Sequence, residues 1–269
     1  MGYELLVCDL DGTLIDRSMA LDPALVSAVK RAAGRGLQVS IATGRMPASV
    51  DRYREELDIR APLIYYNGAL IRDPASGRDL LAHHLPRGIL GTAFEVFANA
   101  PVDPLFFRDE QLYCLELSLP IRSFCGDEGL RAHVIPDPEE FLRQGAFVKT
   151  MFIGHPDVLP IVREDLESVI GGEAKLVRTA SHYLEIVPAA ASKGSALGCL
   201  AEHLGVPLER VVAVGDQEND VEMIRAAGLG VAMPHAPDAV RAAADRTAPP
   251  AADGGLLALF ADALPDYFR

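Results

Sequence analysis

The chain has 269 residues and a formal net charge of −13, with 38 Asp and Glu residues against 25 Lys and Arg. Hydrophobic residues make up 49% and charged residues 23%, a balance that is typical of a folded globular protein and excludes a disordered or fibrous chain. The negative charge, the absence of a Lys/Arg cluster and the lack of tryptophan argue against binding of nucleic acid or of an anionic membrane surface.

The sequence also predicts a cytoplasmic protein. Its four cysteines are scattered, without the paired spacing of a metal site, which favours free thiols in a reducing compartment. The first residues carry no basic segment before their short apolar run, and no apolar stretch reaches the length of a membrane-spanning helix. We therefore expect neither a signal peptide nor a membrane anchor; the oligomeric state stays open.

The first third of the chain alternates strand and helix patterns. Apolar runs predict strands, and a helix is expected between each pair, the first of them after the Asp22-Pro23 cap; the strands are 5–9, 37–42 and 62–66. Strands that alternate with helices predict a parallel sheet. Each strand ends in polar residues, at the carboxyl edge where open parallel sheets bind their ligands.

The middle of the chain has a different pattern, and the first pattern then returns. Two strand pairs, a single strand and three helices are expected between residues 85 and 185, which is typical of a separate α+β domain; the single strand is 147–153, and the helices are 89–98, one from Pro138, and 159–170. A helix capped by Ser192, strands over 210–214 and 229–233, and a helix over 251–264 follow. We predict an α/β protein, with a Rossmann-like doubly wound parallel sheet core (1–84 and 186–269) and an inserted α+β domain (85–185).

The clearest local signal is Asp9-Leu10-Asp11-Gly12-Thr13, directly after the first apolar strand. Asp-Gly is common in turns, so a structural turn is one interpretation. The other is catalytic: one carboxylate acts as a nucleophile and the second as a general acid and base, while a metal ion neutralises them.

Three more segments favour the catalytic interpretation. Thr43 ends the second strand and offers a hydroxyl group, although it also suits a helix cap. Lys193 opens a helix, where the helix dipole disfavours a cation, so it points either into solvent or toward an anion. The turn over 215–220 holds three carboxylates and is either a solvated loop or a set of oxygen ligands suited to Mg²⁺.

Taken together in this order, these segments resemble the haloacid dehalogenase-like superfamily, and in particular its Cof-type phosphatases, which carry a large α+β cap. The resemblance covers both ends of the chain by motif and the middle by length and topology; the matching motifs are DLDGT at 9–13, ATGR at 42–45, NGA at 67–69, SKG at 192–194, GDxxND with Met at 215–223, AGLGVAM at 227–233 and DGG at 253–255. It implies a Mg²⁺-dependent phosphatase that hydrolyses small phosphate monoesters, such as a sugar phosphate, a nucleotide or a cofactor phosphate, through an aspartyl-phosphate.

The resemblance also implies catalytic roles. Asp9 would attack the phosphorus, and Asp11 would protonate the leaving alcohol and then activate the hydrolytic water. Thr43 and Lys193 would hold the phosphoryl oxygens, where charge develops in the transition state.

The metal and substrate ligands follow in the same way. Mg²⁺ would be held by Asp9, the backbone carbonyl of Asp11, and Asp216, with Asn219 and Asp220 in support. The remaining expected substrate-binding residues are Gly44, Arg45 and Asn67, together with Asn219.

Two matters stay open at this point. Pro234-His235-Ala236 stand where the family usually has Gly-Asn-Ala, which leaves the role of this loop undefined. A phosphosugar mutase on the same core, or a non-catalytic sugar-phosphate sensor, is the alternative to the phosphatase. The inserted domain shows no convincing substrate-selecting set, since Arg178, His182 and Tyr183 fit an exposed strand pair better than a site.

Overall fold

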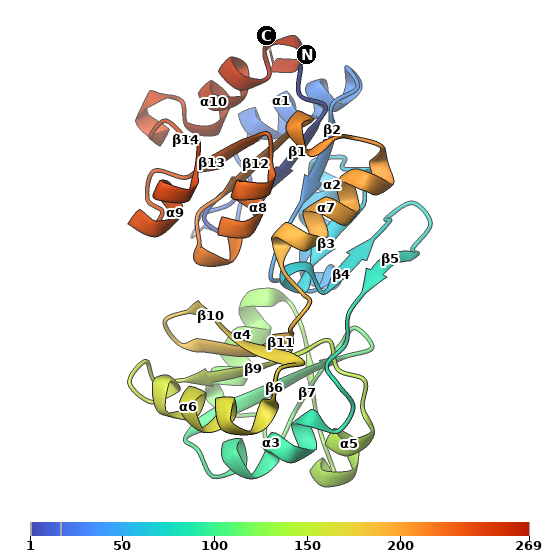
Figure 1. The fold of residues 1–269 in the computed structure, drawn as a ribbon, viewed down its shortest axis with the longest axis vertical. Coiled ribbons are helices and arrows are strands. Elements are labelled where there is room, and N and C mark those ends of the chain that lie inside the picture. The colour runs from blue at the N-terminus through green and yellow to red at the C-terminus, as the bar shows by residue number, and fades with distance from the viewer. Residues whose placement is uncertain (1, 17, 269) are drawn as a thin grey trace. The chain divides into compact units, whose positions relative to one another are not determined.

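A computed structural model describes residues 2–16 and 18–268. The chain forms two compact units (Figure 1). The first consists of the chain up to Arg45, Val50–Ala82 and the chain from Ser192 on, and the second of Met46–Ser49 and His83–Ala191. The second unit therefore interrupts the first along the sequence.

The first unit is built on a five-stranded parallel sheet. Its strand order is β14-β13-β12-β1-β2, with bounds β1 (Leu5–Cys8), β2 (Gln38–Ile41), β12 (Val211–Gly215), β13 (Leu229–Ala232) and β14 (Arg246–Thr247). β1 has a partner strand on each side: Leu5 pairs with Val211 of β12 and with Gln38 of β2. Every residue of β1, β12 and β13 is buried, as expected for a parallel sheet whose two faces are both covered.

The two longest helices of the first unit, 23–34 and 193–204, begin at residues whose side chains cap them. The helix bounds in this unit are α1 (Pro23–Gly34), α2 (Pro47–Glu56), α7 (Lys193–Leu204), α8 (Val221–Ala226), α9 (Asp238–Ala243), α10 (Gly255–Ala263) and α11 (Pro265–Phe268). The Asp22 carboxylate accepts a hydrogen bond from Ala24 N–H at the start of α1. Leu197 and Leu200 of α7 join Leu5 in one buried cluster, which holds α7 against the sheet. The expected α/β class with a Rossmann-like core is confirmed.

One expected strand pairs differently from the prediction. β3 (Leu63–Tyr65) is antiparallel to β4 (Leu70–Arg72), which is antiparallel to β5 (Asp79–Ala82), so assigning it to the parallel sheet was wrong. The reason is the turn 66–68, whose three residues have φ of 51°, 56° and 93° and reverse the chain at once. A single parallel bridge between Ala42 and Ile64 still holds β3 beside the end of β2.

The second unit is an α+β domain on a six-stranded sheet. The strand order is β10-β11-β9-β6-β7-β8, antiparallel except between β7 and β8, with bounds β6 (Val102–Arg108), β7 (Gln111–Cys114), β8 (Ala132–Val134), β9 (Lys149–Gly154), β10 (Ala174–Ala180) and β11 (Tyr183–Pro188). Its helices are α3 (Ile89–Ala98), α4 (Leu119–Glu128), α5 (Pro138–Gln144) and α6 (Leu159–Ile170). Phe97, Phe106, Phe152 and Leu166 join α3 and α6 to the sheet. The bounds of α3 and α6 agree with the prediction, whereas α4 and β8 were not predicted.

Among the described residues, no helix has both the length and the hydropathy needed to cross a membrane.

Candidate active site

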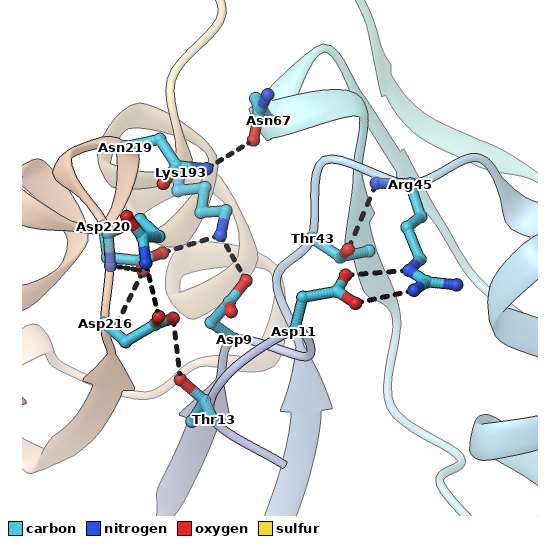
Figure 2. Close-up of polar contacts among 11 residues, drawn as sticks. Asp9, Asp11, Thr13, Thr43, Arg45, Asn67, Lys193, Asp216, Asn219 and Asp220 are labelled. Atoms are coloured by element: carbon cyan, nitrogen blue, oxygen red, sulfur yellow. Dashed lines mark hydrogen bonds and ion pairs between the residues drawn. The ribbon is translucent and has the colours of Figure 1, made fainter. Parts of the chain in front are cut away.

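The chemically active residues of the first unit lie at the ends of neighbouring parallel strands. Asp9 follows β1, Thr43 follows β2 and Asp216 follows β12. Because β1 pairs in parallel with both β2 and β12, these three ends lie at one edge of the sheet. Lys193, the first residue of α7, reaches the same edge, and Figure 2 shows its side chain between Asp9 and Asp220.

A buried ammonium group joins two buried carboxylates at this edge. Lys193 Nζ donates to Asp9 Oδ1 at 2.5 Å and to Asp220 Oδ1 at 2.6 Å. The Lys193 side chain is 1% exposed, and those of Asp9 and Asp220 are 8% and 0% exposed. Of the two interpretations of Lys193, solvation or an anion partner, the structure shows the second.

Close backbone approaches set the position of Lys193. Ser192 Oγ accepts from Ser195 N–H at 3.0 Å and caps α7. A Cβ on Gly194 would lie 2.6 Å from Glu222 Cβ, so a glycine is needed where α7 meets α8. A Cβ on Gly68, which has a φ of 93°, would lie 2.1 Å from the Ser192 carbonyl oxygen. These glycines allow the helix start to lie directly against its neighbours.

The loop after β12 fixes Asp220. Its Oδ2 accepts from the backbone N–H groups of Asp216 and Gln217, both at 2.9 Å, while Oδ1 faces Lys193. A Cβ on Gly215 would lie 2.4 Å from Asp220 Cβ, which explains the glycine. Asp220 thus organises the loop and also neutralises the ammonium group.

Asp216 has a separate set of partners. Thr13 Oγ1 donates to its Oδ1 at 3.3 Å, and Gln217 Nε2 donates to its Oδ2 at 2.7 Å. His235 Nε2 lies 3.4 Å from the same Oδ2. No role was predicted for Thr13, Gln217 or His235, although Thr13 and Gln217 lie inside the DLDGT and GDxxND motifs and His235 lies in the loop that departs from the family pattern.

Burial and mutual repulsion change the acidities of this cluster. Burial raises the pKa of Asp9 well above its ordinary value; Lys193 offsets part of the rise, and Asp220 and Asp216 add to it. Burial also raises the pKa of Asp216, and the hydrogen bond from Gln217 acts against that rise. Burial alone would lower the pKa of Lys193, but Asp220 and Asp9 outweigh it and raise the pKa, so the ammonium group is charged at neutral pH.

The second motif carboxylate, Asp11, lies apart from this cluster. Arg45 Nε donates to its Oδ2 at 2.7 Å and Arg45 Nη2 to its Oδ1 at 2.6 Å, a bidentate pair (Figure 2). The Asp11 side chain is 48% exposed, whereas that of Arg45 is 10% exposed. Thr43 is buried, and its Oγ1 accepts the Arg45 backbone N–H at 3.1 Å. Arg45 is thus placed on Asp11, a contact that the sequence analysis did not foresee.

The two asparagines expected to bind substrate contact each other. Asn219 Nδ2 donates to Asn67 Oδ1 at 2.8 Å. Asn67 adopts the left-handed region with a φ of 56°, which asparagine tolerates better than most residues. A Cβ on Gly44 would lie 3.0 Å from Asn67 Oδ1, so Gly44 leaves room for this amide. The NGA and GDxxND motifs therefore meet in space, as do the DLDGT and SKG motifs.

The donor set fits a divalent cation. Oxygen atoms of Asp9, Asp216 and Asp220 lie within 4.8 Å of one another, and all three residues are buried. The ammonium group of Lys193 pairs with Asp9 and Asp220, and Asp216 is the third carboxylate of the cluster, so Lys193 leaves two formal negative charges without compensation. Hard carboxylate oxygens in this number suit Mg²⁺, which takes one or two carboxylates together with waters and a phosphate.

The strand ends, the lysine and the acidic loop agree with the family suggested by the motifs. The sequence pattern of the haloacid dehalogenase-like hydrolases matches residues 6–260. The chain belongs to this family. The expected enzyme class, a hydrolase of the haloacid dehalogenase type, is confirmed with it.

Two proteins of known name and one crystal structure illustrate what the chain is similar to. The chain is 30% identical to an HMP-PP phosphatase of Serratia proteamaculans over 87% of this chain and 85% of that protein. It is 27% identical to a chloroplastic endoribonuclease, YBEY, of Arabidopsis thaliana, but it spans only 43% of the length of that protein. The crystal structure of a haloacid dehalogenase-like hydrolase from Bacteroides thetaiotaomicron superposes with a TM-score of 0.86 at 25% identity, over 94% of this chain and 97% of that one.

The second unit places its candidate residues at a hairpin turn. Arg178 Nη2 donates to the Ser181 carbonyl at 2.6 Å, and both Arg178 and His182 are exposed. The ring of Tyr183 contacts those of His182 and Phe124. These contacts are those of a turn closed by its own side chains.

Proposed function

We propose that this protein is a Mg²⁺-dependent phosphatase that hydrolyses small phosphate monoesters through an aspartyl-phosphate on Asp9. The observation that carries the proposal is the placement of Lys193 between Asp9 and Asp220, with Asp216 in the same buried cluster. If Lys193 served only in a structural ion pair, one carboxylate would be enough to neutralise it. Three carboxylates beside one ammonium group suit a site that receives a cation and a phosphoryl group together.

Asp9 is the nucleophile in this proposal. One of its carboxylate oxygens attacks phosphorus, the bond between phosphorus and the leaving oxygen breaks, and the leaving alcohol takes a proton from Asp11. Water then attacks the phosphorus of the aspartyl-phosphate and gives a proton to Asp11, which releases phosphate and restores Asp9. Asp9 suits the role because Lys193 fixes its Oδ1, which leaves the other oxygen to react.

Asp11 is half exposed and is the acid and base. Its bidentate pair with Arg45 occupies both carboxylate oxygens, so Asp11 can reach the leaving group only when Arg45 turns away. A phosphoryl group with close to two negative charges competes with Asp11 for Arg45. Arrival of the substrate would thus open the pair, and Arg45 would become a substrate ligand.

The remaining groups bind charge. Lys193 and the Thr43 hydroxyl hold phosphoryl oxygens, and Asn67 and Asn219 form a polar wall beside them. Asp9, the backbone carbonyl of Asp11, and Asp216 would hold Mg²⁺, supported by Asp220, and the ion would screen the phosphoryl charge from these carboxylates.

The substrate would be a small phosphorylated metabolite, and the inserted unit, taken as residues 85–185, would act as the cap that selects its leaving group. The Serratia relative, named for its action on HMP-PP, supports this size class. The four free cysteines support a cytoplasmic site of action.

Release of inorganic phosphate from p-nitrophenyl phosphate and from a panel of phosphorylated metabolites tests the proposal. We expect release with Mg²⁺, loss of release with EDTA, and a loss of at least about a thousandfold in Asp9→Asn, which keeps the shape of the side chain but removes the nucleophile. Activity that survives in Asp9→Asn or without metal would refute it. Phosphate that appears at a second position of a sugar, with little free phosphate, would indicate the mutase, and binding without turnover would indicate the sensor.

A further inference from the structure

His235 occupies a position where the family usually has an asparagine, and a rigid turn holds it there. Ala236 N–H donates to the Met233 carbonyl at 3.1 Å, which closes a four-residue turn with Pro234 at its second position. Proline fixes φ at the value that this turn position needs. His235 is therefore the third residue of a turn with little freedom to move.

The turn is fixed to the end of β12, next to the acidic loop. Met233 N–H donates to the Gly215 carbonyl at 2.9 Å. Gly215 directly precedes Asp216, so this bond ties the turn to the backbone that carries the carboxylate. The result is the 3.4 Å approach of His235 Nε2 to Asp216 Oδ2.

In this contact Asp216 can only be the acceptor, so the hydrogen must come from His235. A carboxylate accepts hydrogen bonds, so the imidazole can approach Asp216 favourably only with the hydrogen on Nε2. Asp216 already accepts from Thr13 and Gln217, and its side chain is 3% exposed. His235 Nε2, at 3.4 Å, is thus a third polar group beside a single buried carboxylate.

We propose that His235 is a positioning residue for Asp216: its Nε2–H orients the carboxylate for binding of the divalent cation. The inference rests on the proposed function, because it requires Asp216 to be a metal ligand. Groups that contact metal ligands fix the orientation of those ligands, and their removal typically weakens metal affinity by about 10- to 100-fold. Asparagine, the usual residue of the family at this position, also carries an N–H donor on its side chain.

The surroundings of His235 tolerate substitution. Its side chain is 53% exposed and borders a cavity of about 480 Å³, which Gly12, Thr13 and Gly255 also line. A smaller side chain at this position therefore leaves no void in the packed core, and the variants should fold.

Titration with Mn²⁺, followed by the electron paramagnetic resonance signal of the free ion, tests the inference without any need for turnover. We expect His235→Ala to raise the Kd for Mn²⁺ about tenfold or more, and His235→Asn to stay within about threefold of the wild type. His155→Ala, a change at an exposed histidine of the second unit, should leave the Kd unchanged. The unfolding midpoints of the metal-free proteins should agree with one another.

Each outcome decides between the two proposals. If His235→Ala binds Mn²⁺ as tightly as the wild type, the positioning role is overturned while the phosphatase stands. An equal rise in the Kd for Mn²⁺ in His235→Ala and His235→Asn would also overturn it. The side-chain amide of asparagine would then fail to substitute for the Nε2–H group of His235. If the wild type itself binds no Mn²⁺, the proposed function fails, and the inference fails with it.

Discussion

Replacement of Lys193 by methionine is the sharpest perturbation of the buried cluster. Methionine keeps most of the aliphatic length of lysine but removes the ammonium group that lies 2.5 Å from Asp9 and 2.6 Å from Asp220. Both carboxylates then stay buried without a cation. We expect the folded state to lose stability, because buried charges without partners are costly.

The magnitude follows from the burial of all three side chains. Removing one partner of a buried ion pair costs about 3–5 kcal/mol, and Lys193 is 1% exposed with two partners, so the upper part of this range applies. For a chain of this size, 1 kcal/mol shifts the unfolding midpoint by roughly 2–4 °C. The expected loss is therefore a fall in Tm of about 10 °C or more.

The loss should depend on pH in a defined direction. Burial raises the pKa of Asp9 in the folded protein above its unfolded value, so its stabilising contribution is complete below about pH 4 and disappears as the pH rises through the folded value. Lys193 lowers that pKa, and its removal raises it further. The stability deficit of Lys193→Met should therefore be smallest in acid and should grow toward neutral pH.

Thermal unfolding from about pH 5 to about pH 8, with and without Mg²⁺, measures both effects. Lys149→Met is the matched control, since Lys149 and Glu185 form an equally buried pair at 2.7 Å in the second unit. Its loss should fall in the lower part of the same range and should not respond to Mg²⁺, whereas the ion should restore part of the stability of Lys193→Met. A deficit under about 1 kcal/mol, or one that is independent of pH, would refute the reasoning.

Three further substitutions test the packing in the two units. Thr150 Oγ1 is buried and has no hydrogen-bond partner among the described residues, so Thr150→Val should raise the free energy of unfolding by about 1 kcal/mol in urea denaturation; a decrease would contradict this. Gly68→Ala should lose at least about 2 kcal/mol, because its Cβ would meet the Ser192 carbonyl, whereas Gly77→Ala, with a positive φ but open space, should lose only about 1 kcal/mol. Similar losses at the two glycines, measured in the same way, would show that the Ser192 contact does not matter.

The segments of the site could be predicted from the sequence because each follows an apolar run or opens a helix. Asp9 ends a strand whose four residues are all buried, and Lys193 follows a serine cap. Local patterns of this kind determine where helices and strands begin. The pairing of β3 with β4 was not predicted, although Asn67-Gly68 is a turn signal, because the reversal also needs positive φ at Tyr66 and Asn67, which residues other than glycine adopt uncommonly.

The sequence by itself determined which residue types follow which strands, and hence the family, the α/β class and the acidic character of one sheet edge. Only the tertiary structure decided which side chain faces each carboxylate: Lys193 binds Asp9 and Asp220, Arg45 binds Asp11, and His235 approaches Asp216. The physical reason is distance along the chain. Periodicity and capping act over a few residues, whereas these partners lie between 19 and 184 positions apart, as between His235 and Asp216 and between Lys193 and Asp9, and meet only through packing of the sheet and its helices.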